Sequence, residues 1–149
     1  MLGIDYGARR IGLALSDATA TLASPWRVVP RPDTDEGTLT LLAREIEALI
    51  AGDDGLEGVV VGWPRRLDGS PTHDTETVEK LVGALEARVP VPVTLQDERL
   101  SSREAESRLA LRERDWRKRK ATLDAVAAAV ILQDYLDNRP RPAAHGFIP

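Results

Sequence analysis

The stretch LGIDYGARRIGLALS, residues 2–16, decides the fold class of this 149-residue chain. Its first part, Leu2–Tyr6, is a short apolar run, and Arg10–Ser16 alternates large and small residues with a period of two, which is typical of a strand. A tight turn at Gly7-Ala8 joins the two, so we predict a hairpin. Asp5 interrupts the apolar run, and a carboxylate inside a strand is costly unless something compensates its charge.

The rest of the chain continues with alternating strand and helix patterns. We expect further strands over residues 25–30, 58–62 and 91–96, and helices over residues 38–51, 75–88, from a capping box at 101–104, and from Thr122 to Asp137. This order is a β-meander followed by helices that alternate with strands. It predicts an α/β fold: a mixed five-stranded sheet with antiparallel and parallel parts, flanked by helices. Sites in such sheets lie at the carboxyl ends of the parallel strands.

Length and composition indicate one domain over residues 1–138, followed by a flexible proline-rich tail over residues 139–149. The chain has no cysteine, which excludes disulfides, thiolate zinc sites and cysteine catalysis. No apolar run approaches the roughly 20 residues that a membrane helix requires. We therefore expect a soluble, cytoplasmic protein that does not bind membranes.

Two further acids stand in settings as unusual as that of Asp5. Glu98 ends a short strand in VTLQDERLSS, and Asp124 opens the helical segment ATLDAVAAAVILQDYL. Brought together, three carboxylates would make a hard-oxygen site for Mg²⁺ or Mn²⁺, and two such ions can drive in-line cleavage of a phosphodiester. Each acid also has a structural alternative: Asp5 in a turn, Glu98 in a surface ion pair, and Asp124 at a favourable helix end.

The net charge of -4 hides one basic region. Residues 99–120 hold nine basic and four acidic side chains, so they carry +5 and the remainder carries -9. A single basic region on an acidic protein suggests a local polyanion site, whereas a solvated helix face with ion pairs is the alternative.

Four ordered blocks carry a resemblance to a known family: GIDYGARRIGLALSD, VVVGWPRRLDGS, DERLSS and TLDAVAAAVILQDYL. Together they resemble the YqgF/RuvX family, whose members have a ribonuclease H-like fold. The family is described as Holliday-junction resolvases and as nucleases that mature the small-subunit ribosomal RNA precursor. The resemblance implies that Asp5, Glu98 and Asp124 are the catalytic acids and metal ligands. Trp63 and the pair Arg65-Arg66 depart from the family pattern and leave substrate preference open.

Other residues near these blocks are candidates for substrate binding. Guanidinium and ammonium groups bind phosphate, and aromatic side chains stack on bases. Trp63 can equally be a residue packed beside Pro64, whereas Trp116 has polar neighbours and is the better stacking candidate. The candidates are Arg9, Arg10, Trp63, Arg99, Trp116, Arg117, Lys118, Arg119 and Lys120.

We therefore predict a metal-dependent endonuclease that uses two Mg²⁺ or Mn²⁺ ions and acts on structured or single-stranded nucleic acid, as a monomer or homodimer. Ribosomal RNA precursor, cleaved at the 5′ end of pre-16S rRNA, is the first choice of substrate, and branched DNA is the second. A non-catalytic RNA-binding assembly factor and an actin-like nucleotide-binding domain are the rival classes.

Overall fold

The computed structural model describes residues 1–64, 68–72, 74–97 and 116–139, except for the side chains of residues 116–122. Its sheet has five strands in the order β3-β2-β1-β4-β5. The β3–β2 and β2–β1 pairs are antiparallel, whereas the β1–β4 and β4–β5 pairs are parallel, which confirms the predicted mixed sheet. The strands are β1 (Leu2–Tyr6), β2 (Arg10–Ser16), β3 (Ala23–Pro30), β4 (Val59–Trp63) and β5 (Val93–Asp97), and the described helices are α1 (Asp35–Ala51), α2 (Thr75–Arg88) and α4 (Trp116–Asn138).

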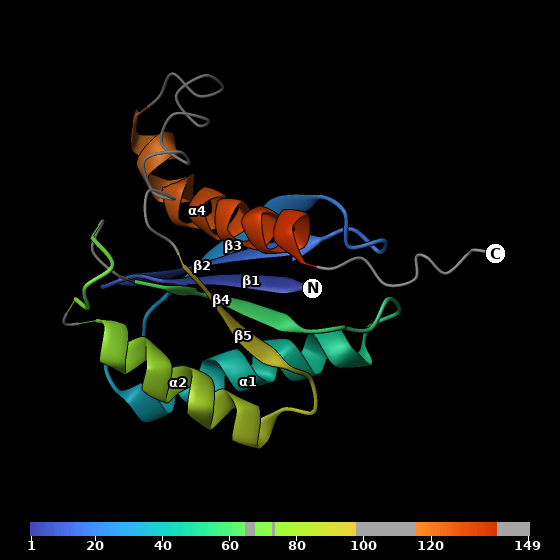
Figure 1. Cartoon of the computed structure of the whole chain (residues 1–149), viewed down its shortest axis with the longest axis horizontal. Helices are drawn as coiled ribbons and strands as arrows, with labels where there is room; N and C mark the ends of the chain where they lie inside the picture. The colour runs from blue at the N-terminus through green and yellow to red at the C-terminus, as the bar shows by residue number, and fades with distance from the viewer. Residues whose placement is uncertain (65–67, 73, 98–115, 140–149) are drawn as a thin grey trace.

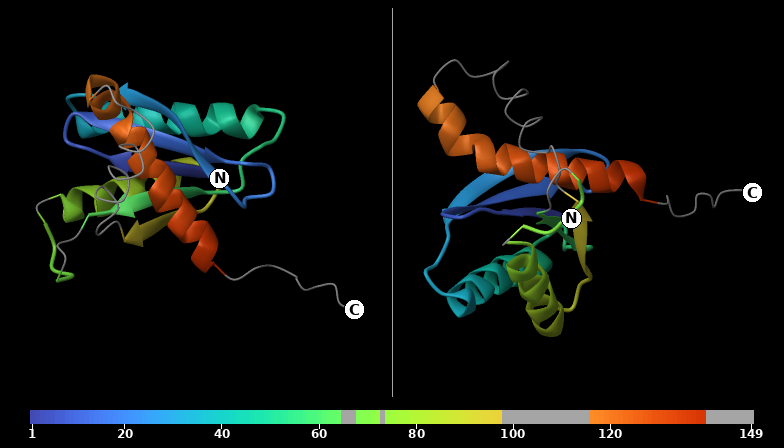
Figure 2. Two further views of the ribbon diagram at one scale, coloured as in Figure 1. Left: turned by 90° about the horizontal axis from the view of Figure 1, so that it is seen from above. Right: turned by 60° about the vertical axis from the view of Figure 1, so that its left-hand side comes forward.

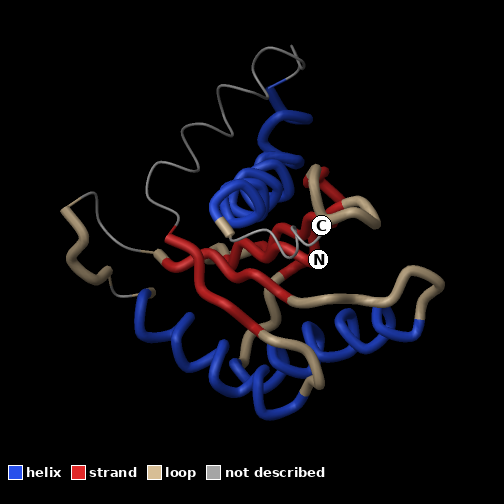
Figure 3. The backbone as a smooth tube through the Cα atoms, turned by 45° about the vertical axis from the view of Figure 1, so that its right-hand side comes forward, coloured by secondary structure: helices blue, strands red, loops and turns tan. Residues whose placement is uncertain are grey.

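Helices cover both faces of the sheet, α4 on one face and α1 with α2 on the other (Figure 1). The period-two pattern of the strands explains this arrangement, because successive side chains point to opposite faces. Leu2, Ile4 and Leu13 are fully buried in the core beneath, together with the apolar sides of α1 and α2. The other face presents small residues such as Gly3 and Ala14 to α4. Figure 3 shows the same three layers with the helices in blue and the strands in red.

The strand boundaries differ slightly from the predicted ones, for local reasons. β5 begins at Val93 because Pro92 has no N–H to donate to a ladder, while its carbonyl accepts a hydrogen bond of 2.9 Å from the Val59 N–H. β4 is shifted by one residue toward the carboxyl end. β3 begins at Ala23, two residues before its predicted start, because Ala23 pairs with Ser16, the last residue of the long strand β2.

Two helices begin earlier than predicted. α1 begins at Asp35 because the Thr34 side chain caps it, with Oγ1 accepting the Gly37 N–H at 2.9 Å. α4 begins at Trp116 and not at Thr122. Arginine and lysine are good helix formers, so the basic run 117–120 extends the helix backbone toward its amino end. The capping box at 101–104 and residues 140–149 of the tail lie outside the described residues.

Helix α4 crosses the sheet at unusually short range, and Figure 2 shows it running obliquely over the strands. A Cβ atom built on Gly3 would lie 2.8 Å from the Leu132 Cβ and 2.9 Å from the Ala128 carbonyl oxygen. A Cβ atom built on Gly12 would lie 1.9 Å from the carbonyl oxygen of Asp124. Only glycine fits at these two crossings, so they determine where each turn of α4 lies above the sheet. Within the described part of the chain, no helix is long and apolar enough to span a membrane.

Candidate active site

Asp5 and Asp124 lie at the same end of the sheet and on the same face. Gly3 faces α4, and Asp5, two residues further along β1, therefore points to that face as well. Asp5 pairs with Gly12 in the β1–β2 register, and Gly12 is the residue that contacts the Asp124 backbone. The fold thus brings together two of the three acids that the sequence analysis singled out.

The Asp124 carboxylate is paired with a cation. Arg10 Nε donates a hydrogen bond of 3.0 Å to Asp124 Oδ2, and the two side chains are 44% and 25% exposed. Asp5 is also only partly buried. The acids are therefore accessible to solvent at the carboxyl end of the central strand β1.

Arg31 holds the turn between β1 and β2, and the sequence analysis did not single it out. Its Nη1 donates a hydrogen bond of 3.1 Å to the Gly7 carbonyl, and its guanidinium lies 4.1 Å from the centre of the Tyr6 ring. Its backbone N–H donates to the Arg9 carbonyl at 2.9 Å. These contacts arise because the antiparallel β2–β3 pairing returns the end of β3 to the start of β2. The predicted meander was the one sequence signal that pointed toward this placement.

Several of the predicted site residues are placed only in part. Glu98 and Arg99 lie outside the described residues, directly after the end of β5. Trp63 ends β4 opposite Asp97 and is partly buried. The alternation along β4 puts it on the α1–α2 face, away from Asp5, because Val61 packs in that core. Trp116, Arg117, Lys118, Arg119 and Lys120 form the start of α4, and their side chains lie outside the description.

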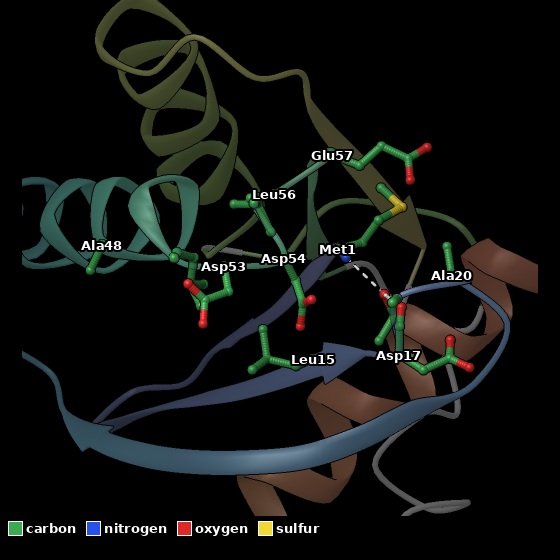
Figure 4. Close-up of a pocket in the computed structure, with 14 residues that line it drawn as sticks. Met1, Leu15, Asp17, Ala20, Ala48, Asp53, Asp54, Leu56 and Glu57 are labelled. Atoms are coloured by element: carbon green, nitrogen blue, oxygen red, sulfur yellow. Dashed lines mark hydrogen bonds between the residues drawn. The ribbon is translucent and has the colours of Figure 1, made fainter.

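The described arginines and carboxylates are distributed unevenly between the two ends of the sheet. Arg9, Arg10 and Arg31 surround the β1–β2 turn beside the paired acids. A pocket of about 310 Å³ lies at the opposite end, where β1 begins and β2 ends (Figure 4). Four carboxylates line that pocket, and they belong to Asp17, Asp53, Asp54 and Glu57. A polyanion is repelled at this pocket, whereas at the other end, here called the basic end, the three arginines offer positive groups beside the acids.

The donor atoms at the basic end suit a divalent cation. Asp5 and Asp124 offer carboxylate oxygens, which are the ligands that Mg²⁺ and Mn²⁺ prefer. The residues that the structure describes contain no group of three or more His, Asp or Glu side chains arranged to hold a metal. Glu98, the third predicted ligand, lies outside them. In the described part of the chain, two of the three predicted ligands thus lie on one face at the same end of the sheet.

Comparison with a solved structure defines the class of protein first. The structure of RuvC from Thermus thermophilus covers 92% of this chain and 97% of its own chain, with a TM-score of 0.50 and 16% sequence identity. A likeness at this identity concerns the fold alone. The chain has the ribonuclease H-like fold that the sequence motifs led us to expect.

Sequence comparison then gives the family. The model of the RuvX family, described as Holliday junction resolvase, matches residues 1–138. A relative from Maridesulfovibrio salexigens, provisionally named pre-16S rRNA nuclease, is 40% identical over 136 residues, which is 91% of this chain and 96% of the relative. A relative with the same name from Anaeromyxobacter sp. strain K is 41% identical over 138 residues, or 93% and 96% of the two chains. The chain belongs to the RuvX family and is a nuclease, so its substrate is a nucleic acid.

Proposed function

We propose that this nuclease is a metal-dependent endonuclease that hydrolyses phosphodiester bonds of ribosomal RNA precursor, at the 5′ end of pre-16S rRNA. The placement of Asp5 and Asp124 carries the metal-dependent part of the proposal. The close crossing at Gly12 brings these acids to one face at the carboxyl end of β1. The name shared by the relatives supports the choice of RNA.

Asp5, Asp124 and Glu98 would hold Mg²⁺ or Mn²⁺. A pair of such ions supplies an activated water as nucleophile and stabilises the leaving oxygen of an in-line displacement. In this role the acids provide negative charge at a defined place and form no covalent bond with the substrate. Asp5 lies on the central strand β1, between β2 and β4, and would be one of the residues that hold the ions.

The basic side chains around the acids would hold the substrate backbone. Arg9 and Arg10 project from the turn beside Asp124, and both are exposed. Arg99 follows the proposed ligand Glu98 directly in the sequence. The run 117–120 belongs to the same helix as Asp124, so it extends the positive charge along the chain toward the acids. Guanidinium groups grip phosphate oxygens in a bidentate fashion, which suits this role.

A resolvase acting on branched DNA is the second candidate, and the description of the matching family model favours it. The two candidates use the same acids and differ in the shape of the substrate. A non-catalytic RNA-binding factor predicts a third behaviour: binding that survives the loss of Asp5, with no metal-dependent product.

The test uses purified protein with a pre-16S rRNA 5′ fragment and a DNA four-way junction, each with Mn²⁺, Mg²⁺ or chelator. We expect metal-dependent cleavage of the RNA and a loss of roughly 100-fold or more in rate for Asp5→Asn, because this change removes charge but little volume. Adding Asp124→Asn should change little further, since members of a catalytic unit are not additive.

Asp53→Asn is the matched control, because Asp53 is an exposed acid at the opposite end of the sheet. It should keep the wild-type rate. Cleavage of the junction alone would replace RNA by branched DNA as the substrate. Wild-type turnover in purified Asp5→Asn protein would refute the catalytic role of the acids.

A further inference from the structure

Arg10 binds one carboxylate oxygen of Asp124, a residue that the proposed function assigns as a metal ligand. Its Nε lies 3.0 Å from Asp124 Oδ2, although 114 residues separate the two in the sequence. Arg10 is the first residue of β2. Among the described residues it makes no other ion pair.

Asp124 does not need this ion pair to stay in position. The backbone of α4 is seated on Gly12, and a Cβ atom there would lie within 2.2 Å of the Asp124 carbonyl carbon. The close backbone crossing therefore determines where Asp124 lies. The side chain of Arg10 is 44% exposed, and ion pairs this accessible to water are weak. The guanidinium can leave without moving the helix.

The ion pair balances the charge of the acids instead of holding Asp124 in place. Two carboxylates that share one face repel each other, and a nearby cation offsets this repulsion. A divalent ion bound by the same carboxylates supplies that positive charge instead, and it repels the guanidinium. Arg10 and the metal ion thus compete for Asp124.

We propose that Arg10 holds Asp124 in the metal-free protein and that metal binding transfers Asp124 from Arg10 to the metal. This inference rests on the proposed function, because it needs a metal site at Asp124. Once released, the guanidinium stands beside Arg9 at the same turn, where a phosphate group of the substrate meets it. Metal loading then strengthens the binding of nucleic acid, and the coupling is reciprocal.

Calorimetry with Mn²⁺ alone tests the competition without any substrate. Metal-stripped Arg10→Gln protein should bind Mn²⁺ about two- to fivefold more tightly than the wild type, because no exposed ion pair has to be broken first. Arg10→Lys keeps the charge without the Nε geometry and should lie between the two. Arg9→Gln removes the neighbouring positive charge, and Arg9 has no ion-pair partner among the described residues. It should change the Mn²⁺ affinity by less than about twofold, because an exposed charge that is not in contact is screened.

A spectroscopic readout reports on Arg10 itself. The Nε–H signal that disappears in the Arg10→Gln spectrum belongs to Arg10, and in the metal-free wild type it should be slowed in exchange by its hydrogen bond. Saturating Mg²⁺ should remove that protection. Circular dichroism confirms that each variant is folded.

The outcomes separate the two proposals. Equal or weaker Mn²⁺ binding by folded Arg10→Gln protein, with a wild type that binds Mn²⁺, overturns the competition and leaves the proposed function intact. A wild type that binds no Mn²⁺ by calorimetry overturns the metal-dependent mechanism and, with it, the inference. Protection of the Arg10 Nε–H that persists in saturating Mg²⁺ also overturns the competition.

Discussion

Gly12→Ala is the most direct test of how the fold builds the site. The new Cβ would lie 1.9 Å from the Asp124 carbonyl oxygen, 2.2 Å from its carbonyl carbon and 2.8 Å from the Ala125 nitrogen. All three atoms belong to the α4 backbone, so no flexible side chain can turn away. Real Cβ contacts essentially never fall below 3.0 Å. The helix or the strand must therefore move by about 1 Å, and a misplacement of that size near reacting groups costs on the order of 100-fold in rate.

The same substitution should lower stability by a modest amount. Overpacking a buried contact costs about 1–3 kcal/mol in the free energy of unfolding. For a chain of this length, that corresponds to a fall of roughly 3–10 °C in Tm. We therefore expect a folded Gly12→Ala protein in which the rate falls much more than the stability. Single-turnover cleavage at saturating substrate, measured well below the Tm, gives the rate, and thermal unfolding followed by circular dichroism gives the stability.

Gly83→Ala is the matched control, because Gly83 lies exposed in α2 with no atom within 4 Å of the position of a Cβ. It should raise the free energy of unfolding by about 0.5–1 kcal/mol and leave the rate unchanged, since alanine costs less backbone entropy than glycine in a helix. A Gly12→Ala protein with the wild-type rate and the wild-type Tm would refute the close crossing. A destabilised Gly12→Ala protein with the wild-type rate would refute the claim that the crossing positions Asp124 for catalysis.

Two further predictions concern the supports of the site and of the far end of the sheet. Arg31→Gln removes the hydrogen bond to the Gly7 carbonyl and the contact with the Tyr6 ring, so it should loosen the turn that carries Arg9. Steady-state kinetics should then show a KM raised several-fold with a smaller change in kcat. A fall in kcat at constant KM would contradict this prediction. Hydrogen bonds from the Thr21 and Leu22 N–H groups and the Thr19 hydroxyl lower the pKa of Asp17 below its ordinary value of 3.8. A depressed carboxyl pKa stabilises the fold above the unfolded pKa, and this contribution is lost as the pH falls through the folded pKa. Asp17→Asn should therefore lower Tm at pH 7, and the gap to the wild type should narrow as the pH falls below 3.8; a gap that is the same at both pH values would show that Asp17 acts by size or shape alone.

Sequence periodicity predicted the sheet well because it reports burial directly. The alternation along residues 10–16 marks which side chains face the core, and the strand found there has these bounds. Element ends were less predictable because they depend on backbone partners. Capped by Thr34, α1 begins three residues before its predicted start at residue 38, and β3 is extended by its pairing with Ser16.

By itself the sequence determined the order of strands and helices along the chain and the family, and it singled out the acids that we propose as ligands, because each of these depends on a local pattern of a few residues. Asp5 inside an apolar strand and Asp124 at the head of an alanine-rich helix are examples. Only the tertiary structure decided that the Asp124 backbone rests on Gly12 and that Arg10 pairs with its carboxylate. These contacts join segments more than 100 residues apart, and they depend on how closely a helix approaches a sheet, which leaves no local pattern to read.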